Sequence, residues 1–425
     1  MTTSSAAAGV WTCPFCPLSC DHLGVRVGRS DEPLALQGGH CERASQALGH
    51  FASLPKAVSP EVDGQPASLD AALAAAATLL KASRQPLIAG LGSDVAGTRA
   101  LYPLACATGA VWDSAGGDAL VQGLRALQDR GQFTTTLAEV RTRADLIVFI
   151  GGLPTAVAPL IGTRLDIGDA QVPQRHVVVI GPSADDAATL AGWAGAGVTV
   201  ESIAVQGDLF ETVSVLCALV AQRPLAAAPA ALRALAQRLH AARYAVLVGA
   251  PPRLPAQGAL IVESVHATVG HLNRKTRAAA LWIGGGNGAA TANQVFAWLS
   301  GLPVRSRAGP RGLEHEPLRF GATRLLADGA VDALIWVASF DAQSTPPATT
   351  LPLVVLGHPA LAAHCRRPRT VFIPVATPGI GRAGHVFRTD GTVLMPLRSV
   401  RPDALPGVDE VAKRLLQALQ AGSAA

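Results

Sequence analysis

The residues Leu146-Ile147-Val148-Phe149-Ile150-Gly151-Gly152 indicate the fold class most directly. Five apolar residues, three of them β-branched, followed by two glycines are typical of a strand that is buried on both faces and ends in a tight turn. Similar short apolar runs recur and alternate with helical patterns, as in βαβ units with parallel strands. The other runs lie at residues 86–89, 110–112, 176–180, 198–200, 244–248, 279–283, 333–337, 353–356 and 370–373. The sequence therefore predicts an α/β protein with doubly wound parallel sheets.

The predicted strands are too many for one comfortable sheet, so two α/β domains are expected. Residues 1–57 differ from the rest because they are rich in loops and hold four of the seven cysteines. Short strands are predicted near residues 23–27 and just before Gly38-Gly39, which indicates a small β-module. The Pro- and Ala-rich stretch 223–229 is either a linker or an exposed loop within a domain.

The composition restricts the possible partners. Hydrophobic residues make up 49% of the 425 residues and charged residues only 15%, so we expect sizeable interfaces with other proteins. The formal net charge is +5, but no basic run exceeds two residues, which argues against nucleic-acid binding. No apolar run reaches the roughly 20 residues that span a bilayer, and the first nine residues do not resemble a signal peptide. The expected location is the cytoplasm, with no nucleic-acid or membrane partner.

Four cysteines near the N-terminus form a pattern typical of metal binding. Cys13, Cys16 and Cys20 follow a C-x2-C-x3-C spacing, and Cys41 lies about twenty residues further on. Such a set could ligate a [4Fe-4S] cluster or, as four thiolates, a zinc ion. The alternative is a relic loop whose thiols pack as small hydrophobic groups. Both interpretations remain open at this point.

Glycine-rich loops follow several predicted strands. Gly90-Leu91-Gly92, Gly151-Gly152 and Gly284-Gly285-Gly286-Asn287-Gly288 would lie at carboxyl ends of strands, where open α/β sheets bind ligands. The last loop also precedes a predicted helix, but it is a weak dinucleotide fingerprint because no acidic residue ends a strand about 20 residues later. A tight strand-to-helix turn explains it more simply. The chain contains no P-loop, H-E-x-x-H or G-x-S-x-G motif.

A four-cysteine module followed by a doubly wound body resembles the molybdopterin oxidoreductase family, and most closely the B-type subunit of formylmethanofuran dehydrogenase. The segments that carry this resemblance are 109–113, 134–149, 286–288, 293–295, 372–380 and 387–391. The resemblance implies a [4Fe-4S] cluster beside a pterin, and Arg43 stands where the family often has Lys. It also implies a vestigial pterin crevice lined by Gly90, Gly92, Gly151, Gly152, Gly286 and Asn287. By the same resemblance, residues 156–319 form a domain inserted into one made of 58–155 and 320–425.

One feature of the redox family is absent. Its Cys or selenocysteine ligand to tungsten or molybdenum lies a few residues after the segment that matches 109–113, but residues 114–120 contain no cysteine. Asp118 could bind a metal through oxygen, although capping of the following helix is the simpler role. The chain therefore resembles the non-redox B-type subunit of the methylotroph formyltransferase/hydrolase complex, which implies A-, C- and D-type subunits as partners and no molybdopterin or tungstopterin.

This resemblance implies a structural role in methanofuran- and tetrahydromethanopterin-linked one-carbon metabolism, in which formaldehyde is oxidised to formate. Two alternatives remain. The chain is a redox-active formylmethanofuran dehydrogenase subunit that carries tungsto- or molybdopterin, or it is an iron–sulfur electron-transfer protein.

Overall fold

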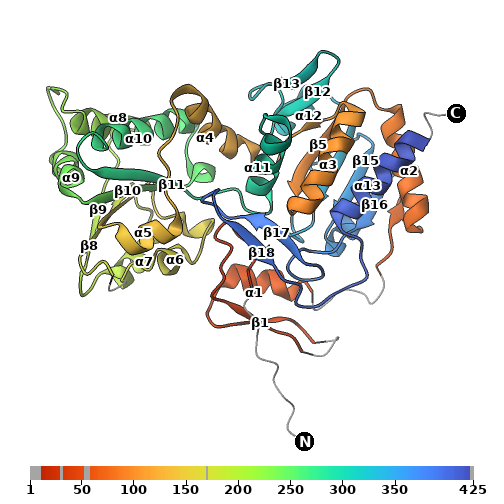
Figure 1. Ribbon diagram of the computed structural model, residues 1–425, viewed down its shortest axis with the longest axis horizontal. Helices are drawn as coiled ribbons and strands as arrows, with labels where there is room; N and C mark the ends of the chain where they lie inside the picture. The colour runs from red at the N-terminus through yellow and green to blue at the C-terminus, as the bar shows by residue number, and fades with distance from the viewer. Residues whose placement is uncertain (1–10, 29–31, 52–57, 169–170, 422–425) are drawn as a thin grey trace, which may run out of the picture. The chain divides into compact units, whose positions relative to one another are not determined.

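The computed structural model describes residues 11–28, 32–51, 58–168 and 171–421 (Figure 1). The chain divides into two compact units. One consists of Met1–Gly117 together with Gly285–Ala425, and the other of Asp118–Gly284. Both are mixtures of sheets and helices, which confirms the predicted α/β class.

The N-terminal part of the first unit is a small antiparallel ribbon followed by a helix. Strand β1 (Gly24–Arg26) pairs with β2 (Ala35–Gln37), and α1 (Glu42–Gly49) follows directly after Cys41. The two strands agree with the predicted β-module, whereas α1 is not predicted by the sequence pattern. Residues 1–10, 29–31 and 52–57 of the expected module 1–57 lie outside the described residues.

A nine-stranded sheet forms the centre of the first unit, in the order β13-β12-β6-β5-β14-β15-β16-β3-β4. Its middle strands are parallel, and the edges are closed by two antiparallel hairpins. The strands are β3 (Glu61–Val62), β4 (Gln65–Pro66), β5 (Pro86–Gly92), β6 (Val111–Trp112), β12 (Ser306–Gly309), β13 (Gly312–His315), β14 (Ala333–Ala338), β15 (Leu353–Gly357) and β16 (Thr370–Pro374).

Five further helices and a separate hairpin complete this unit. They are α2 (Leu69–Ala82), α3 (Val95–Thr108), α11 (Ala289–Ser300), α12 (Ala322–Ala327), α13 (Val408–Ala421), β17 (Gly384–Phe387) and β18 (Leu394–Leu397). Helix α2 begins where its sequence predicts, because the Ser68 hydroxyl accepts a hydrogen bond from the Ala71 N–H at 3.2 Å. Buried aliphatic and aromatic residues of β5, β14, β15 and β16 supply much of the core.

The second unit contains a five-stranded parallel sheet in the order β11-β10-β7-β8-β9. The strands are β7 (Leu146–Ile150), β8 (Arg175–Ile180), β9 (Val198–Ile203), β10 (Tyr244–Gly249) and β11 (Arg277–Trp282). Figure 1 shows α8 and α10 over one face of this sheet and α5, α6 and α7 over the other. The chain order reverses between β7 and β10, which is the usual ligand position in such sheets.

The helices of the second unit are α4 (Gly117–Arg130), α5 (Leu137–Arg143), α6 (Ile161–Leu165), α7 (Asp186–Trp193), α8 (Leu209–Val220), α9 (Ala230–Ala241) and α10 (Gly258–Leu272). Short 3₁₀ turns occur in the chain at Pro154–Ala156, Pro251–Arg253 and Pro359–His364. Residues 223–229 form a loop between α8 and α9, so this stretch lies within the second unit and is not a linker between domains.

The bounds of the inserted unit differ from the expected 156–319. The expected division assigns β7 to the first α/β domain, but it is the central strand of the second unit, where it pairs with β8 and β10. The same division assigns the hairpin β12–β13 to the inserted domain, but β12 pairs with β6 of the nine-stranded sheet. An apolar pattern predicts that a segment is a strand and does not specify the sheet that it joins. Among the described helices, none is long and apolar enough to cross a membrane.

Candidate functional site

The four predicted metal-ligating cysteines lie around one tight loop of the first unit. The Cys13 N–H donates a hydrogen bond to the Cys20 carbonyl at 2.8 Å, which closes the loop. Within it, Ser19 has a left-handed φ of 43°. Cys41 precedes helix α1. All four side chains are buried and none forms a disulfide.

The thiols of this loop affect one another. A hydrogen bond from the Cys20 side chain lowers the pKa of Cys16 to about 7, against the opposing effect of burial. Burial raises the pKa of Cys13 well above its usual value, and the nearby Cys16 and Cys41 raise it further. The donor types suit iron or zinc. Among the described residues, no three His, Cys, Asp or Glu side chains are grouped as ligands of a metal ion, and metal binding by the four cysteines stays a prediction.

Several distant segments of the first unit hold the cysteine loop. The Arg43 Nε donates to the Phe15 carbonyl at 2.9 Å, so the residue in the family's Lys position binds the loop backbone. The Trp11 Nε1 donates to the Gly379 carbonyl at 3.0 Å, and the Thr389 N–H donates to the Pro17 carbonyl at 2.9 Å. The loop therefore joins the N-terminal module to the C-terminal part of the unit.

Four of the six predicted pterin-binding residues lie in the first unit, and the protein's own atoms occupy the space beside them. Gly90 has a φ of 78°, and a Cβ built there would lie 2.6 Å from the Val337 carbonyl oxygen. At Gly92 the Cβ would lie 3.1 Å from the Ala338 Cα, and at Gly286 3.1 Å from the Pro17 Cδ. A side chain at Gly90 would therefore clash with a main-chain oxygen, and at Gly92 and Gly286 it would fit only if the neighbouring atoms moved by a few tenths of an ångström.

Asn287, the fourth of these residues, has a left-handed φ of 51°. Its Nδ2 donates a hydrogen bond to the Asp341 carboxylate at 3.0 Å. Asp341 follows β14, so this amide joins the glycine-rich loop to the carboxyl end of a strand in the nine-stranded sheet. The Asn287 side chain is therefore engaged by the protein itself.

Gly151 and Gly152, the other two predicted residues, lie at the carboxyl end of β7 in the second unit. A Cβ at Gly151 would lie 3.0 Å from the Leu209 Cδ2, and one at Gly152 3.0 Å from the Asp186 Oδ2. Asp186 is almost fully buried and accepts hydrogen bonds from the N–H groups of Ser183 and Leu153, at 2.8 and 3.2 Å. Protein side chains therefore fill the space beside these glycines.

A buried ion pair lies directly before the segment that lacks the metal-ligating cysteine. Asp113 and Arg305 are 2% and 5% exposed, and the Arg305 Nε lies 3.4 Å from the Asp113 Oδ2. The carboxylate also accepts from the N–H groups of Ser114 and Ala322, at 2.9 and 2.8 Å. Burial raises the pKa of Asp113 to about 6, and Arg305 only partly opposes this rise.

The sequence does not predict this ion pair, because no local pattern joins residues so far apart. Asp118, the alternative oxygen ligand, lies in the first turn of α4 and not at the expected capping position. The helix already begins at Gly117, so Asp118 is inside it. An acidic residue in this turn interacts favourably with the helix dipole.

Comparison with known proteins places these features among relatives. No protein-family model matches the chain. The B-type subunit of the formyltransferase/hydrolase complex Fhc of Methylorubrum extorquens is 30% identical over 358 residues, which are 84% of this chain and 95% of that protein. The B-type subunit of the tungsten-containing formylmethanofuran dehydrogenase 2 of Methanocaldococcus jannaschii is 26% identical over 436 residues, which are 92% of this chain and 94% of that protein.

A solved structure is similar over most of the chain as well. A chain in the crystal structure of the formyltransferase/hydrolase complex FhcABCD of Methylorubrum extorquens, determined with methylofuran, gives a TM-score of 0.75. It is 29% identical in sequence, and the match covers 86% of this chain and 100% of that chain.

Proposed function

The chain belongs to the family of B-type subunits of formyltransferase/hydrolase complexes, and we propose that it is a non-redox, structural subunit of such a complex in one-carbon metabolism. The observation that carries this proposal is the segment after strand β6. Residues 114–120 offer no sulfur ligand, and the preceding Asp113 is held in an ion pair with Arg305.

The proposal predicts assembly with three other subunits. Co-expression with the A-, C- and D-type subunits from the same source is expected to yield one stable four-subunit complex on gel filtration. That complex is expected to transfer and hydrolyse formyl groups without reducing a viologen dye when it is given a formylated carrier. Metal analysis of the purified complex provides the control.

Two results would support the other interpretations instead. Tungsten or molybdenum bound with a pterin, together with dye reduction, would indicate a redox formylmethanofuran dehydrogenase. A chain that stays alone in solution and contains about four iron atoms and four sulfides would indicate an electron-transfer protein. Either result would contradict the structural role.

We further propose that the cysteine loop stabilises the fold and does not conduct electrons. Replacing Cys16 by Ser is expected to lower the free energy of unfolding by about 1–3 kcal/mol, because a hydroxyl replaces a buried thiol. Urea denaturation measures this loss. Cys217→Ser, at a half-buried cysteine of α8, is the matched control and should be close to wild type.

Iron determination on the Cys16→Ser variant separates the two roles of the loop. If the variant keeps its stability but loses bound iron and an electron-transfer activity, the loop is a redox element and this part of the proposal is wrong. The seven cysteines, none of which forms a disulfide, also support a cytoplasmic location. Cell fractionation followed by immunoblotting tests this location.

A further inference from the structure

The second unit contains a pocket at the amino ends of β7, β8 and β10, the opposite edge of the sheet from Gly151 and Gly152. The pocket has a volume of about 470 Å³. The end of α9 closes one side, and the residues just before β8 close the other. This volume lies within the range of small-molecule sites in proteins. Nothing in the proposed structural role uses this edge of the sheet.

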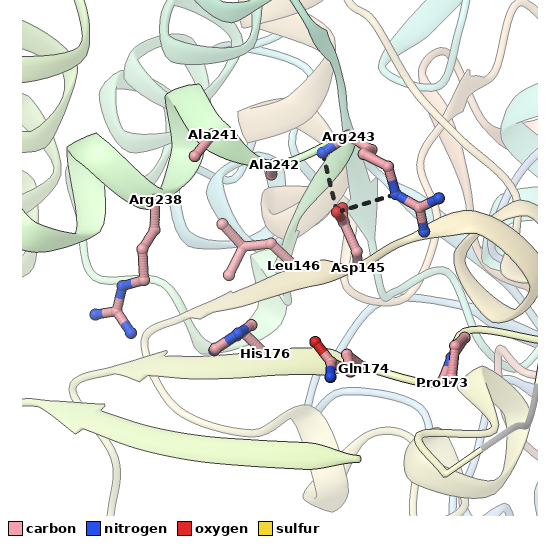
Figure 2. A pocket seen from close by; sticks show the side chains of 9 residues that line it. All are labelled: Asp145, Leu146, Pro173, Gln174, His176, Arg238, Ala241, Ala242 and Arg243. Atoms are coloured by element: carbon pink, nitrogen blue, oxygen red, sulfur yellow. Dashed lines mark hydrogen bonds and ion pairs between the residues drawn. The ribbon is translucent and has the colours of Figure 1, made fainter.

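The polar groups that line the pocket are mostly hydrogen-bond donors or cations. Figure 2 shows Arg238 and Arg243 on opposite sides, with His176 and Gln174 on the neighbouring strand and the loop before it. Asp145 is the one carboxylate among the lining residues. The lining therefore carries two guanidinium groups and one carboxylate.

The Asp145 carboxylate is already engaged. Its two oxygens accept hydrogen bonds from the main-chain N–H groups of Arg243 and Tyr244, at 3.0 and 2.9 Å. Figure 2 shows the first of these bonds. The Arg243 Nε lies 3.6 Å from the same carboxylate, and the Arg243 side chain is 78% exposed. Asp145 thus fixes the start of β10, and the guanidinium of Arg243 stays exposed at the rim of the pocket.

Arg238 is held in place from outside the pocket. Its Nη1 lies 2.5 Å from the carboxylate of Glu201 on β9, and its side chain is 30% exposed. This ion pair orients the guanidinium, whose planar array of five N–H donors can bind a second carboxylate. Glu201 does not line the pocket, so its charge weakens the positive field of Arg238 without occupying the site.

The remaining lining residues are apolar. Leu146, Pro173, Ala241 and Ala242 form this surface. A ligand suited to the pocket therefore combines at least one carboxylate with a short aliphatic body. We propose that this pocket binds carboxylate groups, which Arg238 and Arg243 contact from its opposite sides, with the aliphatic part of the ligand against Leu146 and Ala241.

A purely structural explanation of the two arginines makes a different prediction. Both lie near the C-terminal end of α9, where a positive charge interacts favourably with the helix dipole. If this is their only role, replacing them lowers stability slightly and the pocket binds no carboxylate.

Isothermal titration of the full chain with succinate and glutarate distinguishes these explanations. The wild type is expected to bind both saturably, and more weakly as ionic strength rises. Arg238→Gln and Arg243→Gln are each expected to weaken binding at least tenfold. Arg233→Gln removes the same charge from the exposed side of α9 and should leave binding unchanged. Equal unfolding midpoints for the three variants would show that the differences arise at the site.

The carboxylate can belong to a free acid or to an acidic side chain of another protein in the complex. Saturable binding of the free acids with the pattern above supports the first source. Weaker assembly of the co-expressed complex with Arg238→Gln and Arg243→Gln, but not with Arg233→Gln, supports the second. If neither binding nor assembly depends on the two arginines, or if all three variants behave alike, the proposed site is wrong. Assembly of the wild-type complex remains a separate test of the proposed function.

Discussion

Replacing Asp113 by Ala is expected to lower the free energy of unfolding at pH 7.5 by about 3–5 kcal/mol. The substitution leaves the guanidinium of Arg305, which is 5% exposed, without its carboxylate partner. It also removes the acceptor for the Ser114 and Ala322 N–H groups. Urea denaturation followed by tryptophan fluorescence measures the effect, since Trp112 is adjacent and buried.

A double replacement tests whether the ion pair itself causes this loss. Asp113→Leu with Arg305→Met removes both charges and fills similar volumes, so the double variant should be more stable than Asp113→Ala. Asp328→Ala removes a carboxylate of the same unit whose side chain is 57% exposed, and it serves as a control for the change in net charge. If Asp113→Ala is no less stable than this control, the buried pair does not stabilise the unit.

The pH dependence of the same variant gives a second measurement. Burial raises the folded-state pKa of Asp113 to about 6, above the value of about 4 in an unfolded chain. Between these values the folded state binds the proton more tightly, so the contribution of Asp113 to stability falls as the pH rises from about 4 to about 6. The difference between wild type and Asp113→Ala should therefore shrink through this window. A difference that grows with pH would show that the direction of the pKa shift is wrong.

The sequence predicts the fold well where local chemistry determines it. Helix α2 follows the capping residue Ser68, and β7 coincides with an apolar run that ends in two glycines. Helix α1 escapes prediction because it has only eight residues, most of them polar, within a segment rich in loops. The hairpin β17–β18 escapes it as well, since its strands have only four residues each.

Features that depend on residues far apart in the sequence are much harder to predict from it. The sequence of β7 indicates a buried strand, but its neighbours β8 and β10 begin about 30 and 100 residues later. The boundary of the second unit depends on this pairing, so the expected division at residue 156 differs from the observed one at Asp118. Likewise, Asp113 and Arg305 are 192 positions apart, and nothing around either residue indicates the other. The absence of the metal-ligating cysteine, in contrast, can be read from the sequence, because it concerns only the short segment 114–120.

Replacing Arg175 by Met is expected to lower the stability of the second unit by about 3–5 kcal/mol. Arg175 is 1% exposed, and its guanidinium donates hydrogen bonds to carbonyls at the C-terminal ends of α5 and α6. The four acceptors are the carbonyls of Arg141, Ala144, Leu165 and Asp166, at 2.6, 2.9, 3.4 and 2.6 Å. Helix ends leave carbonyls without internal partners, so the side chain satisfies groups that would otherwise be buried without a donor.

Hydrogen exchange separates this role from a general loss of stability. In Arg175→Met the exchange rates of the amides in α5 and α6 should increase over wild type more than those in α8 and α10. Only the first two helices lose the side chain that donates to their C-terminal carbonyls. Arg175→Lys should be intermediate, since one ammonium cannot reach all four carbonyls in place of a planar guanidinium. Arg233→Met, at an exposed position of α9, is the matched control and should resemble the wild type. Uniform acceleration throughout the unit would mean that Arg175 stabilises the sheet as a whole and not these two helix ends.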